Sequence, residues 1–312
     1  MNITKPKIFL YGGCDLHDIA NNDFLQREFD VISYAVDIHT VDNTQLDFNR
    51  GSFPSKGTSI ISLYTKPGVI AQRVIETLMS NQKRHTIINR QLYNEVCKFQ
   101  YLDFYRKHAG PNDYLLVGFS PELYTKFRGT TDCFSCSPAM NGVSDPDNCL
   151  HWLYEEYLTK DEFLLPFDTK ESLELSFDMM VDFARDIYEI FQDRVILVKT
   201  HFANFAIASN HNIAPVKFDP SDLLYYRQTK IITEPTDLNY AERLSTIIMN
   251  KFRHHYSSSL DLIKLNEPVF LDSNHRWGLG QFHIDANSKN KLAKIILDNI
   301  TKKISTKTII YE

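Results

Sequence analysis

Lys7-Ile8-Phe9-Leu10-Tyr11-Gly12-Gly13-Cys14-Asp15-Leu16-His17-Asp18 is a short apolar run that breaks at two glycines and then places a cysteine at the turn. The run predicts a buried strand, and a helix is expected to begin just after it. Glycine lets the backbone pass close to a bound group, so the N–H groups of Gly13 and Cys14 could point at an anion or a developing oxyanion. Open α/β sheets place their sites at the carboxyl ends of the strands, where this turn would lie. The alternative is an ordinary strand–loop–helix junction whose cysteine has no role.

The composition is that of a soluble globular protein, with 312 residues, of which 43% are hydrophobic and 23% charged. This length suits one large α/β domain with a sizeable insertion. The net charge of −5 provides no basic field for nucleic acid. No apolar run approaches the roughly 18 residues of a membrane span, and the first run is too short for a signal peptide. Together with five cysteines, which fit a reducing compartment, these features predict a cytoplasmic protein.

Strands and helices are expected to alternate over most of the chain, which predicts a mostly parallel sheet covered on both faces. The expected strands after the first are 31–36, 58–64, 113–119, 194–199 and 269–271, and the expected helices are 69–79, 89–108, 171–192, 239–255 and 288–302. Residues 120–168 break this rhythm with aromatic residues and turn formers. They are expected to form an irregular insertion or lid, with a short helix near 151–158, in a single domain that spans 1–312.

The loop from Asp272 to Asp285 holds two histidines and a tryptophan just before the last expected helix. A histidine there could reach the turn after the first strand across the edge of the sheet. It would deprotonate Cys14 or a substrate hydroxyl, because an ordinary histidine pKa near 6.5 suits a general base. The alternative is that these histidines are solvated loop residues.

The two ends of the chain together resemble the SGNH (GDSL-like) hydrolase superfamily. The closest resemblance is to a bacterial branch with a Gly-x-Cys turn, a following aspartate and a late His-x-Trp-Gly and Phe-His loop. Gly12-Gly13-Cys14 and Asp18 match the first motif, and His275-Arg276-Trp277-Gly278 with Phe282-His283 matches the second. Asn49-Arg50-Gly51 loosely resembles the second block of the superfamily.

The resemblance implies a flavodoxin-like three-layer α/β/α sandwich with Cys14 as the nucleophile and His283 as the general base. The aspartate usual three residues before the histidine is Gly280 here, so Asp285, Asp272 or a backbone carbonyl would have to orient His283. The residues expected to hold the oxyanion are Gly13, Gly51 and Asn204, and those expected to contact substrate are Asp18, Arg50, Lys199, His201, His275 and Trp277.

A thiolate readily attacks thioesters, and a cysteine at a helix start near a histidine has a lowered pKa. The expected function is therefore O-acetyl transfer from acetyl-CoA, as co-substrate, to a saccharide hydroxyl in bacterial capsule or surface polysaccharide biosynthesis. Arg50, Lys199 and His201 would receive the donor phosphates. The alternatives are an SGNH-type esterase or deacetylase, and a non-catalytic glycan-binding or assembly protein that keeps the fold.

No metal is expected, although four side chains offer a weak zinc alternative. They are Cys133, Cys136, Cys149 and His151, of which the first two have a common zinc spacing. The competing interpretation is that these are small buried residues that pack an irregular insertion. The expected partners are a saccharide or polysaccharide acceptor, with no nucleic acid and no transmembrane segment, although membrane-bound assembly machinery could be nearby.

Overall fold

The structure is a computed structural model, and it describes most of the chain. The described residues are 5–32, 59–65, 68–80, 96, 100–123, 126–130, 132–135, 143–165, 169–203, 205–207, 212–215, 235–274 and 283–310. Within these ranges, no helix combines the length and the apolar character that crossing a membrane requires.

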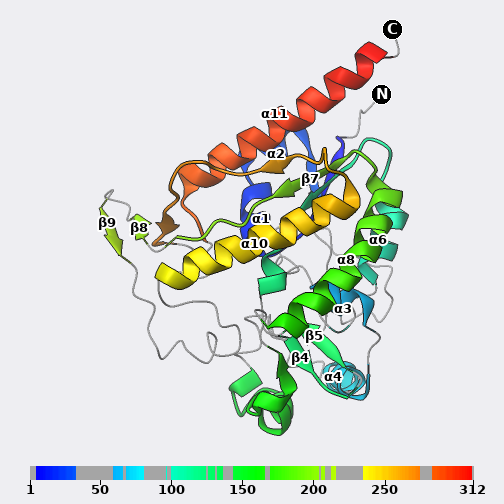
Figure 1. The fold of residues 1–312 in the computed structure, drawn as a ribbon, viewed down its shortest axis with the longest axis vertical. Helices are drawn as coiled ribbons and strands as arrows, with labels where there is room; N and C mark the ends of the chain where they lie inside the picture. Colours follow the sequence, from blue (N-terminus) through cyan, green and yellow to red (C-terminus); the bar gives the residue numbers. More distant parts are fainter. Residues whose placement is uncertain are drawn as a thin grey trace.

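The centre of the molecule is a parallel sheet of five strands (Figure 1). The strands are β1 (Lys7–Tyr11), β2 (Asp30–Ile32), β3 (Tyr114–Val117), β7 (Val195–Val198) and β10 (Leu262–Ile263). They lie in the order β10-β7-β3-β1-β2, and every neighbouring pair is parallel. Numbered along the chain, this order is 2-1-3-4-5, one of the two common orders of doubly wound sheets. The prediction of an α/β fold built on a parallel sheet is confirmed.

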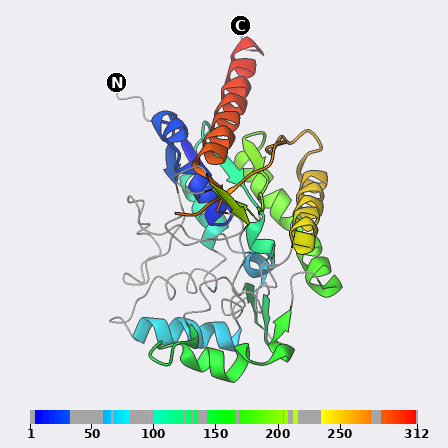
Figure 2. The same cartoon turned by 90° about the vertical axis from the view of Figure 1, so that its left-hand side faces the viewer.

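Helices cover both faces of this sheet because its strands are apolar on both faces. In β1, Phe9 and Tyr11 belong to one core, whereas Ile8 and Leu10 belong to the other. The first core is closed by α3 (Ile60–Tyr64), α6 (Gln100–His108), α8 (Lys170–Phe191) and α10 (Pro235–Tyr256). The second is closed by α1 (Cys14–Ala20), α2 (Asp23–Glu28) and α11 (Ala286–Ile310). Figure 2 shows α10 and α11 on opposite sides of the central strands.

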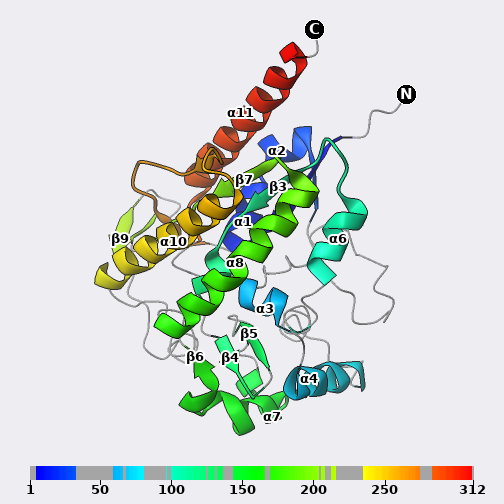
Figure 3. The same ribbon diagram turned by 45° about the vertical axis from the view of Figure 1, so that its right-hand side comes forward.

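A smaller, antiparallel sheet lies beyond the carboxyl end of β3, in the lower part of Figure 3. Its strands are β4 (Lys126–Arg128), β5 (Cys133–Ser135) and β6 (Leu164–Leu165), in the order β5-β4-β6. Around them lie α4 (Val69–Ser80), α7 (His151–Leu153), a π-helical turn (Tyr154–Leu158) and two 3-10 turns (Ser120–Leu123 and Asp161–Phe163). The segment expected to be an irregular insertion therefore contains an ordered sheet, packed around the stacked rings of Phe127 and Phe134.

A buried ion pair ties this smaller sheet to the main body. The Lys126 ammonium lies 3.9 Å from the Glu122 carboxylate, and neither side chain is more than 1% exposed. Lys126 Nζ also donates to the Glu122 carbonyl oxygen at 2.6 Å. The same carboxylate accepts from the Ile60 N–H of α3 at 2.5 Å and from the Ser176 hydroxyl of α8 at 3.2 Å. Burial raises the pKa of Glu122, and the Lys126 charge opposes that rise.

Two strand predictions are wrong. Residues 60–64, expected to be a strand, form helix α3, because Ser59 caps it by accepting from the Ser62 N–H and Glu122 accepts from the Ile60 N–H. Residues 269–271, expected as the last strand, contribute only Leu271, in β11 (Leu271–Asp272) of a separate three-stranded sheet. The other strands of that sheet are β8 (Phe205–Ile207) and β9 (Ile213–Pro215). The fifth strand of the central sheet is β10, which the sequence analysis missed.

The expected helices at 69–79, 171–192, 239–255 and 288–302 are confirmed as α4, α8, α10 and α11, and the short helix expected near 151–158 as α7 with its π-helical turn. Of the helix expected over 89–108, the described part is helical at 96 and over 100–108; residues 89–95 and 97–99 lie outside the described residues. The strand expected at 31–36 is described only as far as Ile32.

The carboxylate of Asp132, the residue before strand β5, caps the N-terminus of helix α4. The Asp132 side chain is buried and accepts from the N–H groups of Gly68 at 2.9 Å, Ile70 at 3.1 Å and Ala71 at 2.9 Å. We expect Asp132→Ala to lower the free energy of unfolding by about 2 kcal/mol, because it leaves these donors without an acceptor. Urea denaturation measures this loss. Asp298→Ala, which removes an exposed carboxylate from α11, is the control and should change stability by less than about 0.5 kcal/mol. Equal effects of the two variants would contradict the capping role.

Candidate functional site

The candidate site lies at the carboxyl edge of the central sheet, where three neighbouring strands end. Strand β1 is followed by Gly12-Gly13-Cys14, β3 by Gly118-Phe119-Ser120, and β7 by Lys199-Thr200-His201. Because these strands are adjacent and parallel, the three segments meet at the same edge. The predicted position of the turn after the first strand is therefore confirmed, although the Cys14 side chain lies outside what the structure describes.

The two glycines allow the loop after β3 to approach the loop after β1 closely. A β-carbon on Gly13 would lie 2.3 Å from Ser120 Oγ, and one on Gly12 would lie 3.2 Å from the Gly118 carbonyl oxygen. The Gly13 N–H donates to Ser120 Oγ at 3.1 Å. In this structure the amide predicted to hold an oxyanion is thus engaged by a serine hydroxyl.

A buried carboxylate joins the three strand ends. Asp15, 9% exposed, accepts from the Ser120 hydroxyl at 2.7 Å on Oδ1 and from the Thr200 hydroxyl at 2.8 Å on Oδ2. The Ser120 proton is directed to Asp15, because Ser120 Oγ is the acceptor for the Gly13 N–H. Burial raises the pKa of Asp15, and the bonds from the two hydroxyls oppose that rise. The arrangement holds a carboxylate of elevated pKa directly after Cys14, where it can position the turn.

Asp15, Ser120 and Thr200 were not among the residues predicted for the site. Each lies within a few residues of the end of a central strand, and that position was the available signal. Hydroxyl and carboxyl groups are common near strand ends. Their position indicates a shared site only once the strands are known to be neighbours in the sheet.

His201 is described, and its geometry fits a neutral imidazole. It is 7% exposed, and its Nε2 accepts from the Leu265 N–H at 3.1 Å, so the proton lies on Nδ1. Burial, together with the nearby Lys199 charge, lowers its pKa to about 4. A neutral His201 could donate one hydrogen bond to a phosphate, as the substrate prediction requires, but it carries no positive charge near neutral pH.

We expect the His201 ring not to titrate between about pH 5 and pH 8. Its pKa is lower in the folded than in the unfolded chain, so this residue contributes stability above the unfolded pKa of 6.5 and the contribution is lost as the pH falls toward about 4. Histidine ring NMR signals followed over pH, with His201→Asn to assign the signal, measure this directly. A His201 signal with a midpoint near 6.5 would contradict the geometry.

The Lys199 side chain reaches helix α10. Its ammonium lies 3.3 Å from the Glu242 carboxylate of α10, so its charge is already paired in this structure. The remaining predicted contacts to the substrate and the oxyanion fall on Arg50, Gly51, Asn204, His275 and Trp277, which lie outside the described residues.

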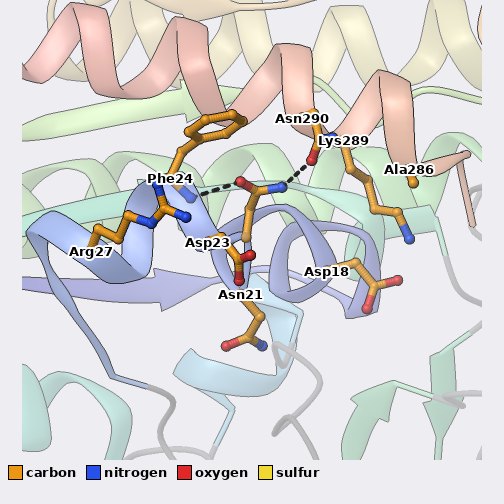
Figure 4. Close-up of a pocket in the computed structure, with 9 residues that line it drawn as sticks. Asp18, Asn21, Asp23, Phe24, Arg27, Ala286, Lys289 and Asn290 are labelled. Atoms are coloured by element: carbon orange, nitrogen blue, oxygen red, sulfur yellow. Dashed lines mark hydrogen bonds between the residues drawn. The ribbon is translucent and has the colours of Figure 1, made fainter.

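The helix that follows the late loop packs against the first helices of the chain. His283 is buried, and its carbonyl oxygen accepts from the Asp272 N–H at 2.9 Å. Helix α11 begins three residues later and packs against α1 and α2 (Figure 1). Asp18 of α1 and Ala286 of α11 line one pocket (Figure 4), which places the segment after His283 beside the helix that Cys14 starts.

Asp285 caps helix α11. Its carboxylate accepts from the Asn287 N–H at 2.9 Å, the Ser288 N–H at 3.1 Å and the Ser288 hydroxyl at 2.6 Å. These bonds account for both oxygens. Its predicted role in orienting His283 stays a prediction, and Asp272 and a backbone carbonyl stay the other candidates.

The zinc alternative gains no geometric support from the described side chains. Cys133 and Cys149 are half-buried thiols, and Cys136 lies outside the described residues. His151 places Nδ1 3.2 Å from the Val143 carbonyl oxygen and Nε2 3.3 Å from the Glu155 carboxylate. In the described ranges, no three histidine, cysteine or acidic side chains are grouped so that they could hold a metal ion.

Comparisons with known proteins leave the site to be interpreted from its own chemistry. No family model matches the chain, and neither a curated protein nor a solved structure matches it.

Proposed function

We propose that the protein is an SGNH-type acyltransferase that moves an acetyl group from acetyl-CoA to a saccharide hydroxyl in bacterial capsule or surface polysaccharide biosynthesis. The observation that carries the proposal is that Cys14 begins helix α1 and that the segment after His283, from the far end of the chain, packs against the same helix. The Asp15 network supports it, because a turn held by three strand ends is suited to position a nucleophile.

In the proposed reaction, the Cys14 thiolate attacks the thioester carbonyl carbon, and the bond from that carbon to the CoA sulfur breaks. CoA leaves as a thiolate and takes a proton from the protonated His283. The acceptor hydroxyl then gives its proton to neutral His283 as its oxygen attacks the acetyl-cysteine carbonyl. Cleavage of the acetyl–Sγ bond returns the Cys14 thiolate, so atoms and charges balance over the two steps.

In this scheme Asp15 positions the turn that carries Cys14. Its carboxylate holds Ser120 and Thr200, and Ser120 in turn holds the Gly13 N–H beside the nucleophile. We class it as a positioning residue, because no contact to a reacting atom is shown. For Gly13 to serve as an oxyanion donor, its N–H would have to exchange Ser120 Oγ for the substrate oxygen.

The test is acetyl-CoA turnover with a panel of saccharide acceptors, for the wild type, Cys14→Ala and His283→Ala. Both variants should lose more than about 100-fold in acetyl transfer. The matched control is Cys149→Ala, which removes a half-buried thiol from the smaller part of the molecule and should retain activity. Mass spectrometry of the wild type with acetyl-CoA and no acceptor should show one acetyl group on Cys14, because the first step needs no acceptor, whereas Cys14→Ala should show none.

Three outcomes would overturn the proposal or redirect it. Unchanged transfer in both variants would remove Cys14 and His283 from the reaction. Release of acetate without any acceptor would indicate the esterase or deacetylase. Saccharide binding with no turnover of any donor would indicate the non-catalytic glycan-binding protein.

A further inference from the structure

A polar pocket lies between the first two helices and the start of the last one. It has a volume of about 350 Å³, within the range of small-ligand sites. Its lining comes from α1 and α2, the turn between them and the first turns of α11, and includes Asp18, Asn22, Phe24, Arg27, Lys289 and Asn290. It thus joins two parts of the chain that are distant in sequence.

The formal charges of the pocket cancel. Two carboxylates, of Asp18 and Asp23, and two cations, of Arg27 and Lys289, line it. Among the described residues, Asp23, Arg27 and Lys289 have no ion-pair partner although they line the same small space. Figure 4 shows Arg27 at one end of the pocket and Lys289 at the other. Such a lining disfavours a polyanion and provides both donors and acceptors for an uncharged polar ligand.

A hydrogen bond between two asparagine side chains fixes one wall of the pocket. Asn22 Nδ2 donates to Asn290 Oδ1 at 2.5 Å, which joins α2 to α11, and Asn22 Oδ1 accepts from the Phe24 N–H at 3.0 Å. Next to this wall, Phe24 is 42% exposed. An exposed ring beside amides and unpaired charges matches the surface of a sugar, which has an apolar C–H face and a rim of hydroxyl groups that both donate and accept.

The pocket is also close to the proposed reaction. Asp18 is four residues after Cys14 on α1, about 6 Å along the helix axis, and Ala286 is three residues after His283. We propose that this pocket binds the acceptor saccharide, as an uncharged sugar, with Arg27 and Lys289 contacting its hydroxyl groups and Phe24 covering its apolar face. The acceptor role rests on the proposed function, whereas the ligand class and the location rest on the pocket itself.

The test is direct binding without acetyl-CoA, measured by calorimetry and by NMR titration. The probes are N-acetylglucosamine, galactose, disaccharides that contain them, glucuronate and inorganic phosphate. The variants are Phe24→Ala and the double variant Arg27→Ala/Lys289→Ala. The control is Lys294→Ala, which removes an exposed lysine from the same helix outside the pocket. We expect a neutral sugar to bind the wild type and the control equally and to bind both pocket variants at least tenfold more weakly.

The result separates this inference from the proposed function. Equal binding by wild type and pocket variants, binding of phosphate alone, or no sugar binding at all would overturn the inference. Acetyl transfer whose saccharide KM is unchanged in the pocket variants would overturn it while the proposed function stands. Sugar binding that the pocket variants weaken, with no acetyl transfer by the wild type, would support the saccharide site and overturn the transferase.

Discussion

Lys126→Met should lower the free energy of unfolding at neutral pH by about 3–5 kcal/mol, the usual cost of removing one partner of a buried ion pair. Methionine fills a similar volume but removes the charge that faces Glu122, whose side chain is 1% exposed. It also removes the donor to the Glu122 carbonyl oxygen. Of its partners among the described residues, the buried carboxylate would keep the Ile60 N–H and the Ser176 hydroxyl.

The pH dependence of this loss identifies its cause. Burial already raises the pKa of Glu122 above 4.5, and removal of Lys126 would raise it further. A carboxyl group with a raised folded pKa contributes stability below its unfolded pKa and loses that contribution as the pH rises through the folded pKa. The difference between wild type and Lys126→Met should therefore be smaller near about pH 5 than near about pH 8.

Urea denaturation at both pH values measures these effects. The double variant Glu122→Gln/Lys126→Met removes both charges and should recover more than half of the loss, because no unpaired charge is then buried. A surface pair, Lys170→Met/Glu174→Gln, is the control and should change stability by less than about 1 kcal/mol. A destabilisation by Lys126→Met that does not change with pH and is not relieved in the double variant would show that the effect is packing alone.

Asp15→Ala should lower the free energy of unfolding by about 3 kcal/mol and reduce any acetyl transfer strongly. The change leaves the buried hydroxyls of Ser120 and Thr200 without their acceptor and opens a cavity between three strand ends. Since Ser120 also holds the Gly13 N–H, the turn that carries Cys14 should loosen. Denaturation and acetyl-CoA turnover, measured on the same preparations, check both effects.

Asp15→Asn separates the charge from the shape. Asparagine keeps the size of the side chain and one acceptor oxygen but cannot titrate. The folded pKa of Asp15 is raised above 3.8, so wild-type stability declines as the pH rises through that folded pKa, and the variant lacks this term. The stability of Asp15→Asn minus that of the wild type should thus increase as the pH rises from 3.8 to the folded pKa of Asp15 and level off above it. A flat difference would mean that Asp15 has no raised pKa.

The local sequence pattern predicted the strands that are buried along their length and the helix with a long apolar stripe. The runs that became β3 and β7 are apolar at every position, and that of β1 is apolar from Ile8 onward, which is typical of strands covered on both faces. The apolar stripe of α8 repeats at helical spacing over 22 residues, so its signal is strong. Strand β10 has two residues, too few for any period, and only its pairing with β7 makes it a strand.

Residues 60–64 show how tertiary contacts override local preference. Ile60-Ile61-Ser62-Leu63-Tyr64 is rich in residues that favour strands. The segment is helical because Ser59 and Glu122 accept hydrogen bonds from the N–H groups of its first turn, and Glu122 lies 62 residues away in sequence.

For the candidate site, local signals suffice to predict a glycine-glycine-cysteine turn at the end of the first strand, because an apolar run, two glycines and a helix start all lie within twelve residues of sequence. Which groups surround that turn depends on contacts between residues that are distant in sequence. The partners of Asp15 are 105 and 185 residues away, and they meet it because β1, β3 and β7 end at one edge. Burial at that edge then raises the pKa of Asp15 and lowers that of His201, since a charge loses its hydration where side chains exclude water.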